Sequence, residues 1–332
     1  MKTFISRSIA FCLFVILSAC SGDDDPVATE PNPSNKSISE LLASEADYSI
    51  LNEALDRTGL SANLNDTGSF TLFAPNNAAF NALFTAEAYS DLDALIQDIG
   101  TGQLRDILSY HLLGESINWA SFESGYYQSM TQTNAKDNLS LYLSKSAIVQ
   151  INSSATVVAA NINANNGVVH GVDNVLMPLS VYELLAVHPD YSSLTAAIGL
   201  ADGDLDSVLS DENKTYTFFA PNNAAFDTIV ARTPNVSNLF EYVATLGTDA
   251  LADLILYHGS SGAYLAADLQ TGNLSSLAVD GNGNSLQFFV NLGSTVRLID
   301  NSPFTDDAQV IETDMVGTNG VLHFIDALML PN

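Results

Sequence analysis

Apolar and polar positions follow two different periods along the chain. At 48–55 and again at 191–198, apolar residues recur with the spacing of an amphipathic helix. Short apolar runs at 70–73 and 216–219 predict buried strands. A longer amphipathic stretch at 92–108 predicts a further helix. The pattern therefore predicts a mixed α/β (α+β) fold.

Cap residues and further apolar runs refine these elements. Asn76 or Asn77, and Asn222 or Asn223 later in the chain, can cap a helix N-terminus, because the amide oxygen accepts a hydrogen bond from an unpaired backbone N–H. The remaining predicted strands are 139–143, 149–151, 157–158, 168–177, 286–290 and 321–330.

The chain contains the same unit twice. The eight residues from Phe73 to Phe80 recur unchanged from Phe219 to Phe226, at an offset of 146. Other matches keep the same order while the offset grows from 143 to 153, so the second copy carries a few insertions. These matches pair Glu40–Ala43 with Glu183–Ala186, Asp47–Ser49 with Asp190–Ser192, Tyr110-His111 with Tyr257-His258, and 166–170 with 319–323. A tandem duplication predicts domains at 38–179 and 180–332.

The repeated motifs resemble those of a known family. Phe73-Ala-Pro-Asn-Asn-Ala-Ala-Phe80 resembles the first signature box of the fasciclin domain, and the segment from Asn166 to Pro178 resembles the second. Tyr110-His111 lies between them, as in the family. The resemblance implies a β-wedge flanked by helices, and a role in extracellular adhesion rather than catalysis.

The family also links its Tyr-His segments to adhesion. The resemblance therefore makes Tyr110, His111, Tyr257 and His258 candidate binding residues. The alternative is that they pack at a helix end and make a buried hydrogen bond.

The N-terminus has the pattern of a targeting segment. A basic start and an apolar stretch lead to Leu17-Ser18-Ala19-Cys20, which resembles the lipobox of bacterial lipoproteins. We expect a signal peptide at 1–19, lipidation of Cys20, and a flexible acidic tether at 20–37. The acidic cluster at 23–25 is similar to the surface-export signal of some Gram-negative lipoproteins. These features predict a lipid anchor in the outer membrane, with the protein exposed at the surface.

Composition narrows the partners. With 38 acidic and 10 basic residues, the formal net charge is −28, which disfavours nucleic-acid binding because phosphate backbones are repelled. No apolar run approaches the roughly 20 residues of a membrane helix, so we expect membrane contact through the lipid anchor only. Removal of 1–19 would leave Cys20 as the only cysteine, which excludes an internal disulfide.

Sequence motifs of catalysis are missing. There is no Gly-x-Ser-x-Gly, His-Glu-x-x-His, Walker loop or Gly-x-Gly-x-x-Gly. Of the five histidines, His170 and His323 form one repeat-related pair and are predicted to make hydrogen bonds near the closing strand of each copy. The sequence predicts no cofactor and no enzyme activity.

Two acidic segments have part of the spacing of a calcium loop. The run that starts at Asp202 has Ser207 in place of the glycine and Asn213 in place of the final glutamate. The run that starts at Asp280 fails in the same way, with Asn291 at the last position. We therefore interpret the first as a helix start and the second as a hairpin turn, and predict no metal site.

Comparison of the two copies offers candidate binding residues. At offset 147, Trp119 corresponds to Ala266 and Tyr126 to Asn273, so neither aromatic ring belongs to a core that both copies share. Exposed Trp and Tyr often contact sugar rings or protein partners. Local repacking in the first copy is the alternative. Phe304, in a segment present only in the second copy, is a weaker candidate.

Two functions remain open from the sequence. The first is a surface-anchored, non-catalytic adhesion or ligand-binding lipoprotein that contacts an extracellular protein or polysaccharide. The second is an accessory glycan-binding lipoprotein of an outer-membrane polysaccharide-uptake system.

Overall fold

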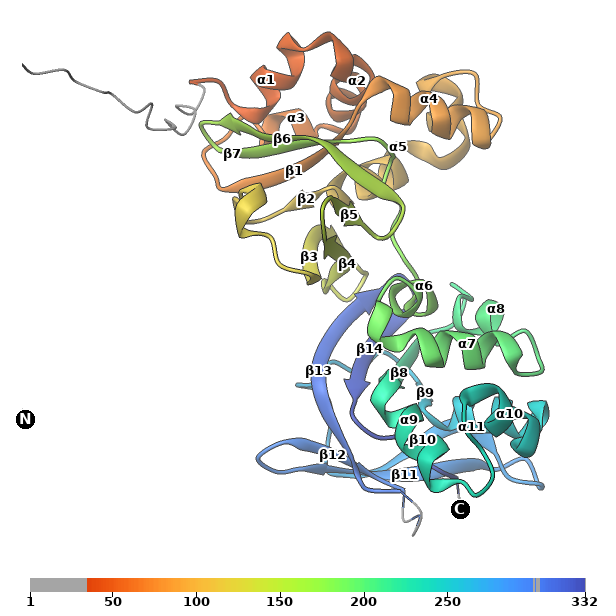
Figure 1. Cartoon of the computed structure of the whole chain (residues 1–332). Coiled ribbons are helices and arrows are strands. Elements are labelled where there is room, and N and C mark those ends of the chain that lie inside the picture. The colour runs from red at the N-terminus through yellow and green to blue at the C-terminus, as the bar shows by residue number, and fades with distance from the viewer. Residues whose placement is uncertain (1–34, 301, 303–304, 332) are drawn as a thin grey trace, which may run out of the picture. The chain divides into compact units, whose positions relative to one another are not determined.

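Two copies of one α+β unit follow each other in the computed structural model, which describes residues 35–300, 302 and 305–331 (Figure 1). The described residues belong to one compact unit. No helix among them is long and apolar enough to cross a membrane. Cys20, the acidic cluster at 23–25 and Phe304 lie outside the described residues.

The first copy begins with helices and ends with strands. Its helices are α1 (Ile38–Ser44), α2 (Ser49–Thr58), α3 (Leu60–Asn63), α4 (Asn77–Ala86) and α5 (Leu92–Tyr110), with short 3₁₀ turns at Ala46–Tyr48 and Trp119–Ser121. Its strands are β1 (Phe70–Pro75), β2 (Leu112–Leu113), β3 (Gly125–Gln132), β4 (Asn138–Lys145), β5 (Val149–Ile151), β6 (Ala155–Ala164) and β7 (Gly167–Val172).

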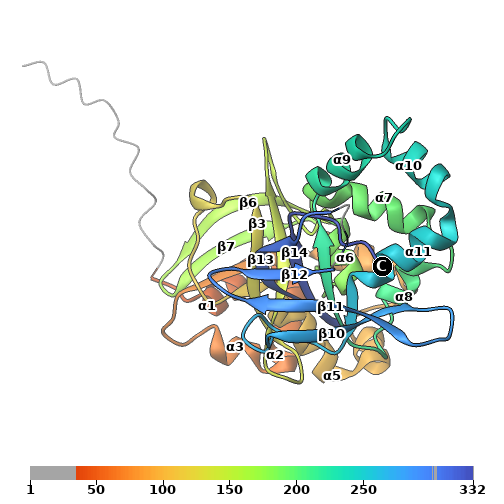
Figure 2. The same cartoon turned by 90° about the horizontal axis from the view of Figure 1, so that it is seen from below.

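The second copy repeats this order. Its helices are α6 (Val181–Ala186), α7 (Ser192–Leu200), α8 (Leu205–Leu209), α9 (Asn223–Arg232), α10 (Leu239–Leu246) and α11 (Thr248–Tyr257), with a 3₁₀ turn at Pro189–Tyr191. Its strands are β8 (Tyr216–Pro221), β9 (Gly259–Ser261), β10 (Gly272–Val279), β11 (Ser285–Leu292), β12 (Val296–Ile299), β13 (Ala308–Gly317) and β14 (Gly320–Ile325). Figure 2 shows helices α7, α9, α10 and α11 gathered on one side of its strands.

The strands form a closed barrel in the first copy and a seven-stranded sheet in the second. In the first, β1 to β7 pair in sequence order, and β7 closes the ring by pairing in parallel with β1. In the second, the order is β10-β11-β12-β13-β14-β8-β9, and β14 pairs in parallel with β8. The predicted mixed fold is confirmed, and the predicted closing strands end earlier than expected, at Val172 and Ile325.

The first signature box forms a strand followed directly by a helix. The Asn76 side chain accepts a hydrogen bond from the backbone N–H of Ala79 and caps α4, and Asn222 caps α9 in the same way. Asn77 has a different role, since its side-chain oxygen accepts a hydrogen bond from the backbone N–H of Ile50. The first asparagine of each pair is therefore the cap, and the second ties the helix to the preceding turn.

The amphipathic stretch at 92–108 is two helical segments rather than one. Gly100 interrupts α5 with φ +80° and ψ 161°, and Gly247 separates α10 from α11 with φ +89°. A side chain is disfavoured at such angles, so glycine permits the break in both copies.

Candidate binding surfaces

The Tyr-His pairs lie inside the fold. The Tyr110 hydroxyl donates a hydrogen bond to the Ser140 carbonyl oxygen at 2.6 Å and accepts one from the Asn152 side chain at 3.0 Å. The Tyr257 hydroxyl donates to the corresponding carbonyl of Gln287 at 2.9 Å. Burial raises the pKa of Tyr257 to about 12. Each tyrosine therefore fixes the last helix of its copy to the sheet.

The histidine of each pair joins the same helix to the chain after the closing strand. His111 Nδ1 donates to the Ile107 carbonyl oxygen at 2.8 Å, and its Nε2 accepts from the Leu176 backbone N–H at 2.8 Å. Because Nε2 accepts, the ring must be neutral. His258 repeats this arrangement with Leu254 and Met329. Burial lowers the pKa of both imidazoles to about 4.

These contacts match the structural alternative for the Tyr-His pairs. All four side chains are buried, with exposed fractions between 0 and 2%. A ligand on the surface of the described fold cannot touch them. Any part in adhesion stays a prediction, and it would have to act through the scaffold that they hold.

The second signature box is also a hydrogen-bonding centre. His170 Nε2 donates to the Ile117 carbonyl oxygen at 2.9 Å, and His323 Nε2 donates to that of Tyr264 at 2.8 Å. Burial lowers the pKa of both rings. The predicted role near the closing strand is therefore confirmed.

Asn166 completes the box. Its buried side chain accepts from the Ile38 backbone N–H at 2.9 Å and donates to the carbonyl oxygens of Leu64 and Asp66 at 2.7 and 2.9 Å. Asn319 has the corresponding contacts with Val181, Leu209 and Asp211. In each copy this amide, just before the closing strand, holds the first helix against the segment that leads into the first strand.

Trp119 begins the 3₁₀ turn Trp119–Ser121, and hydrogen bonds with other parts of the first copy hold this segment in place. Its backbone N–H donates to the Asn161 side chain at 2.8 Å, and the Lys145 ammonium donates to the carbonyl oxygens of Ala120 and Phe122 at 2.9 and 2.7 Å. The indole is partly buried against the barrel core of the first copy. The ring is therefore less exposed than the comparison of the copies predicts, and its role in ligand binding stays a prediction.

Tyr126 reaches the second copy. Its hydroxyl donates a hydrogen bond to the Leu184 carbonyl oxygen at 2.7 Å. Its ring centroid lies 5.7 Å from that of Phe324, and the ring packs against the core of the second copy. The prediction that the Tyr126 ring is exposed is therefore wrong, because the ring is partly buried against the second copy. A role of Tyr126 in ligand binding stays a prediction.

The contact between the copies, called the joint below, has further members. The Val316 backbone N–H donates to the Ser140 hydroxyl at 2.9 Å, and the His188 ring centroid lies 4.7 Å from that of Tyr142. The joint consists of Tyr126, Ser140 and Tyr142 from the first copy and Leu184, His188, Val316 and Phe324 from the second.

Sequence reasoning missed the second copy's side of the joint. His188 corresponds to Glu45 at offset 143, and Phe324 corresponds to Gly171 at offset 153. The comparison that singled out Tyr126 finds both of these residues when it is extended to the other offsets.

Comparison with protein families matches the model described as "Fasciclin domain" to residues 46–178 and 189–331. The chain belongs to the fasciclin domain family. The two matched segments correspond to the two copies, called the first and second fasciclin domains from here on.

Individual relatives agree with this assignment. Transforming growth factor-beta-induced protein ig-h3 of Sus scrofa is 30% identical over 282 residues, which cover 83% of this chain and 37% of the relative. Protein sll1483 of Synechocystis sp. is 32% identical over 152 residues, which cover 46% of this chain and 79% of the relative. The chain therefore spans little more than a third of the ig-h3 relative.

A solved structure shows the same fold. It is a FAS1 domain pair from the insect cell adhesion molecule Fasciclin I, with 19% sequence identity and a TM-score of 0.50. The match covers 86% of this chain and 98% of that chain.

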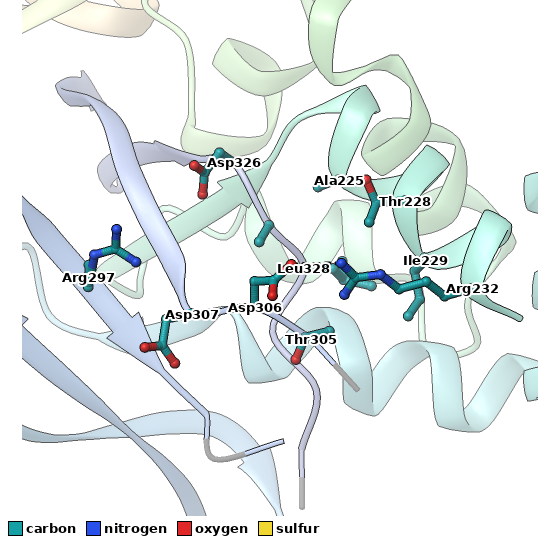
Figure 3. Close-up of a pocket in the computed structure, with 11 residues that line it drawn as sticks. Ala225, Thr228, Ile229, Arg232, Arg297, Thr305, Asp306, Asp307, Asp326 and Leu328 are labelled. Atoms are coloured by element: carbon teal, nitrogen blue, oxygen red, sulfur yellow. Dashed lines mark hydrogen bonds and ion pairs between the residues drawn. The ribbon is translucent and has the colours of Figure 1, made fainter. Parts of the chain in front are cut away.

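A charged hollow lies in the second fasciclin domain (Figure 3). Arg232 of α9 and Arg297 of β12 line it together with Asp306, Asp307 and Asp326. The guanidinium of Arg232 lies 2.7 Å from a carboxylate oxygen of Asp306. This exposed ion pair links the loop before β13 to α9 and contributes little to stability in water.

The two acidic segments form a turn and a helix start. The Asp280 carboxylate accepts hydrogen bonds from the backbone N–H groups of Asn282 and Asn284, which forms the predicted hairpin turn. α8 begins directly after Asp204, as expected for a helix start. Within the described residues, no group of three or more His, Cys, Asp and Glu side chains is placed to hold a metal ion.

Proposed function

We propose that this chain is a surface-anchored adhesion protein that binds an extracellular protein or polysaccharide without catalysis. The joint is the observation that carries the proposal. It links the two fasciclin domains through aromatic contacts and hydrogen bonds, and we infer that their outer surfaces act together. Two linked surfaces bind an extended ligand more tightly than one, because the second contact forms within the same complex.

The use of the histidines supports a non-catalytic role. A general base must be able to take a proton near the working pH. The four repeated histidines are instead neutral, enclosed and occupied by backbone partners. The residues common to both domains thus serve the scaffold, and binding falls to residues in which the domains differ.

The anchor part of the proposal rests on the sequence before the fold. Cys20→Ala should move the protein from the membrane fraction to the soluble fraction, whereas Cys12→Ala, within the predicted signal peptide, should not. External protease should shave the protein from intact cells if the acidic cluster at 23–25 is an export signal. Sedimentation of the Cys20→Ala protein with membranes would contradict the anchor, and full protection from protease would contradict surface exposure.

The binding part of the proposal needs a ligand screen. The full-length Cys20→Ala protein is applied to an array of extracellular matrix proteins and polysaccharides, and cells with and without the protein are compared for adhesion to the ligands found. We expect at least one ligand and a loss of adhesion without the protein. An empty array together with unchanged adhesion would refute the proposal.

An accessory glycan-binding role in polysaccharide uptake is the second candidate. The face of the second fasciclin domain described next favours it. Polysaccharide-specific binding with no effect on adhesion would select this role.

A further inference from the structure

The face that makes the joint exists twice. In the first domain it is the outer face of β3 and β4, where Tyr126 lies opposite Tyr142. In the second domain the corresponding strands are β10 and β11, where Asn273 lies opposite Phe289. The buried tyrosine of each domain confirms this correspondence, because it donates to the carbonyl of Ser140 in one and of Gln287 in the other.

The two faces differ in burial. Ser140 and Tyr142 are 2% and 3% exposed because the second domain covers them. Their counterparts Gln287 and Phe289 are exposed and partly exposed, respectively. Phe288, between them, is buried in the domain core, so strand alternation directs Gln287 and Phe289 outward. The first domain uses this face to contact the second domain. In the second domain the corresponding face is left uncovered.

The residues of the uncovered face have a different chemistry. Two tyrosines and a serine are replaced by Asn273, Phe289 and Gln287, so one aromatic ring now lies among amides. The Asn273 side chain donates to that of Gln287 at 3.2 Å, which orients both amides beside the ring. Ile299 is in register with Phe289 on its other side, and exposed Asn291 lies two residues further along β11.

Two hollows include residues of these strands. One hollow, at the start of β10, includes Asn273 and is lined by Tyr264, Gln270 and Thr271 among others. Tyr264 corresponds to Ile117 in the first domain, so the first domain lacks a polar aromatic residue at this position. The other is the charged hollow of Figure 3, which includes Arg297 of β12.

We propose that the outer face of β10, β11 and β12 binds a neutral polysaccharide. A sugar ring stacks on Phe289, and the amides of Asn273, Gln287 and Asn291 form hydrogen bonds with its hydroxyl groups. Amides suit hydroxyl groups because each amide both donates and accepts. Aromatic side chains supply an apolar surface for the ring. This inference rests on the proposed function and names its ligand class and site.

Two observations favour a neutral glycan over other ligands. The excess of acidic over basic residues, 38 against 10, gives the chain a negative charge that repels polyanionic glycans. The first domain shows how this face contacts a protein partner, namely through two tyrosines, of which Tyr142 is buried and Tyr126 partly buried. The second domain has Asn273 and Phe289 in place of the two tyrosines, and the amide suits a hydrated ligand better.

Affinity electrophoresis of the detergent-solubilised full chain tests the site. Native gels contain soluble starch, laminarin or xyloglucan as neutral probes, or alginate as a charged one. We expect retardation by at least one neutral glycan and none by alginate. Phe289→Ala should weaken the affinity at least tenfold, and Asn273→Ala should weaken it measurably. Phe240→Ala is the matched control, because Phe240 on α10 is 66% exposed and far from this face in sequence.

Each outcome has a defined meaning. Equal retardation of wild type, Phe289→Ala and Asn273→Ala overturns the site, and so does retardation by alginate alone or by no glycan. If the wild type then still binds a matrix protein on the array, the proposed function stands without this site. Circular dichroism and thermal melting identify a misfolded Phe289→Ala, in which case Gln287→Ala and Asn273→Ala decide the result.

Discussion

Replacement of Tyr126 should weaken the joint. Tyr126→Phe removes only the hydroxyl that donates to the Leu184 carbonyl at 2.7 Å. A net hydrogen bond in a folded protein is worth about 1 kcal/mol, so we expect a loss of that size. Tyr126→Ala also removes the ring from its contacts with Phe324 and His188.

The alanine variant should cost more. Truncation of a fully buried aromatic residue to alanine lowers the free energy of unfolding by about 3–5 kcal/mol. Because Tyr126 is only partly buried, we expect about 2–3 kcal/mol, hydroxyl included. Asn273→Ala is the matched control, since it changes the corresponding exposed position of the second domain and should alter stability by no more than about 0.5 kcal/mol.

Denaturant unfolding of the full chain measures both effects. Trp119 is the only tryptophan, so its fluorescence reports unfolding of the first domain, whereas far-UV circular dichroism reports both domains. In the wild type the two signals should change together, because the joint couples the domains. In Tyr126→Ala the unfolding of the first domain, followed by Trp119 fluorescence, should shift to lower denaturant concentration and separate from the unfolding of the second domain. Coincident transitions at an unchanged midpoint in Tyr126→Ala would refute the role assigned to the joint.

Three further predictions concern the scaffold. The free energy of unfolding should fall by up to about 3 kcal/mol per domain between pH 6.5 and pH 4, because unfolded histidine takes up a proton near 6.5 whereas folded His111 and His258 do so only near 4. Urea melts at several pH values check this, and His111→Ala should flatten the dependence in the first domain. Asn166→Ala should cost about 2–4 kcal/mol, since it leaves buried backbone groups without partners; an unchanged melt would contradict this. Trp119→Ala should cost about 1–2 kcal/mol for a partly buried ring, and wild-type emission should be partly quenched by iodide; a loss above about 3 kcal/mol would make Trp119 a core residue.

The repeated motifs made much of the fold predictable. The proline at the end of each buried strand and the asparagine that follows it indicated where β1 and β8 stop and where α4 and α9 start. The choice between Asn76 and Asn77 could not be made, because both suit a cap and the tie from Asn77 to Ile50 needs the tertiary structure. The break at Gly100 could not be predicted either, because one glycine within an amphipathic stretch does not reveal a backbone with positive φ.

The candidate site was harder to predict. Comparison of the copies correctly showed that Tyr126 is outside the shared core, since Asn273 takes its place. It could not tell a residue that faces a ligand from one that faces the other copy, because both kinds are missing from the sister domain. The contact with Leu184, 58 residues further along the chain, decides between them.

The joint also explains why the two domains differ where they do. A contact between successive repeats uses different faces of each, so a row of identical repeats could extend without limit. Here both outer faces have diverged. The first domain has Gly171 where Phe324 makes the joint, and a Cβ at Gly171 would clash with the Tyr48 hydroxyl. The second domain has Asn273 where Tyr126 makes it. The side chains that make the joint are therefore missing from both outer faces. This leaves the amide-lined face of β10 and β11 for the ligand that we propose.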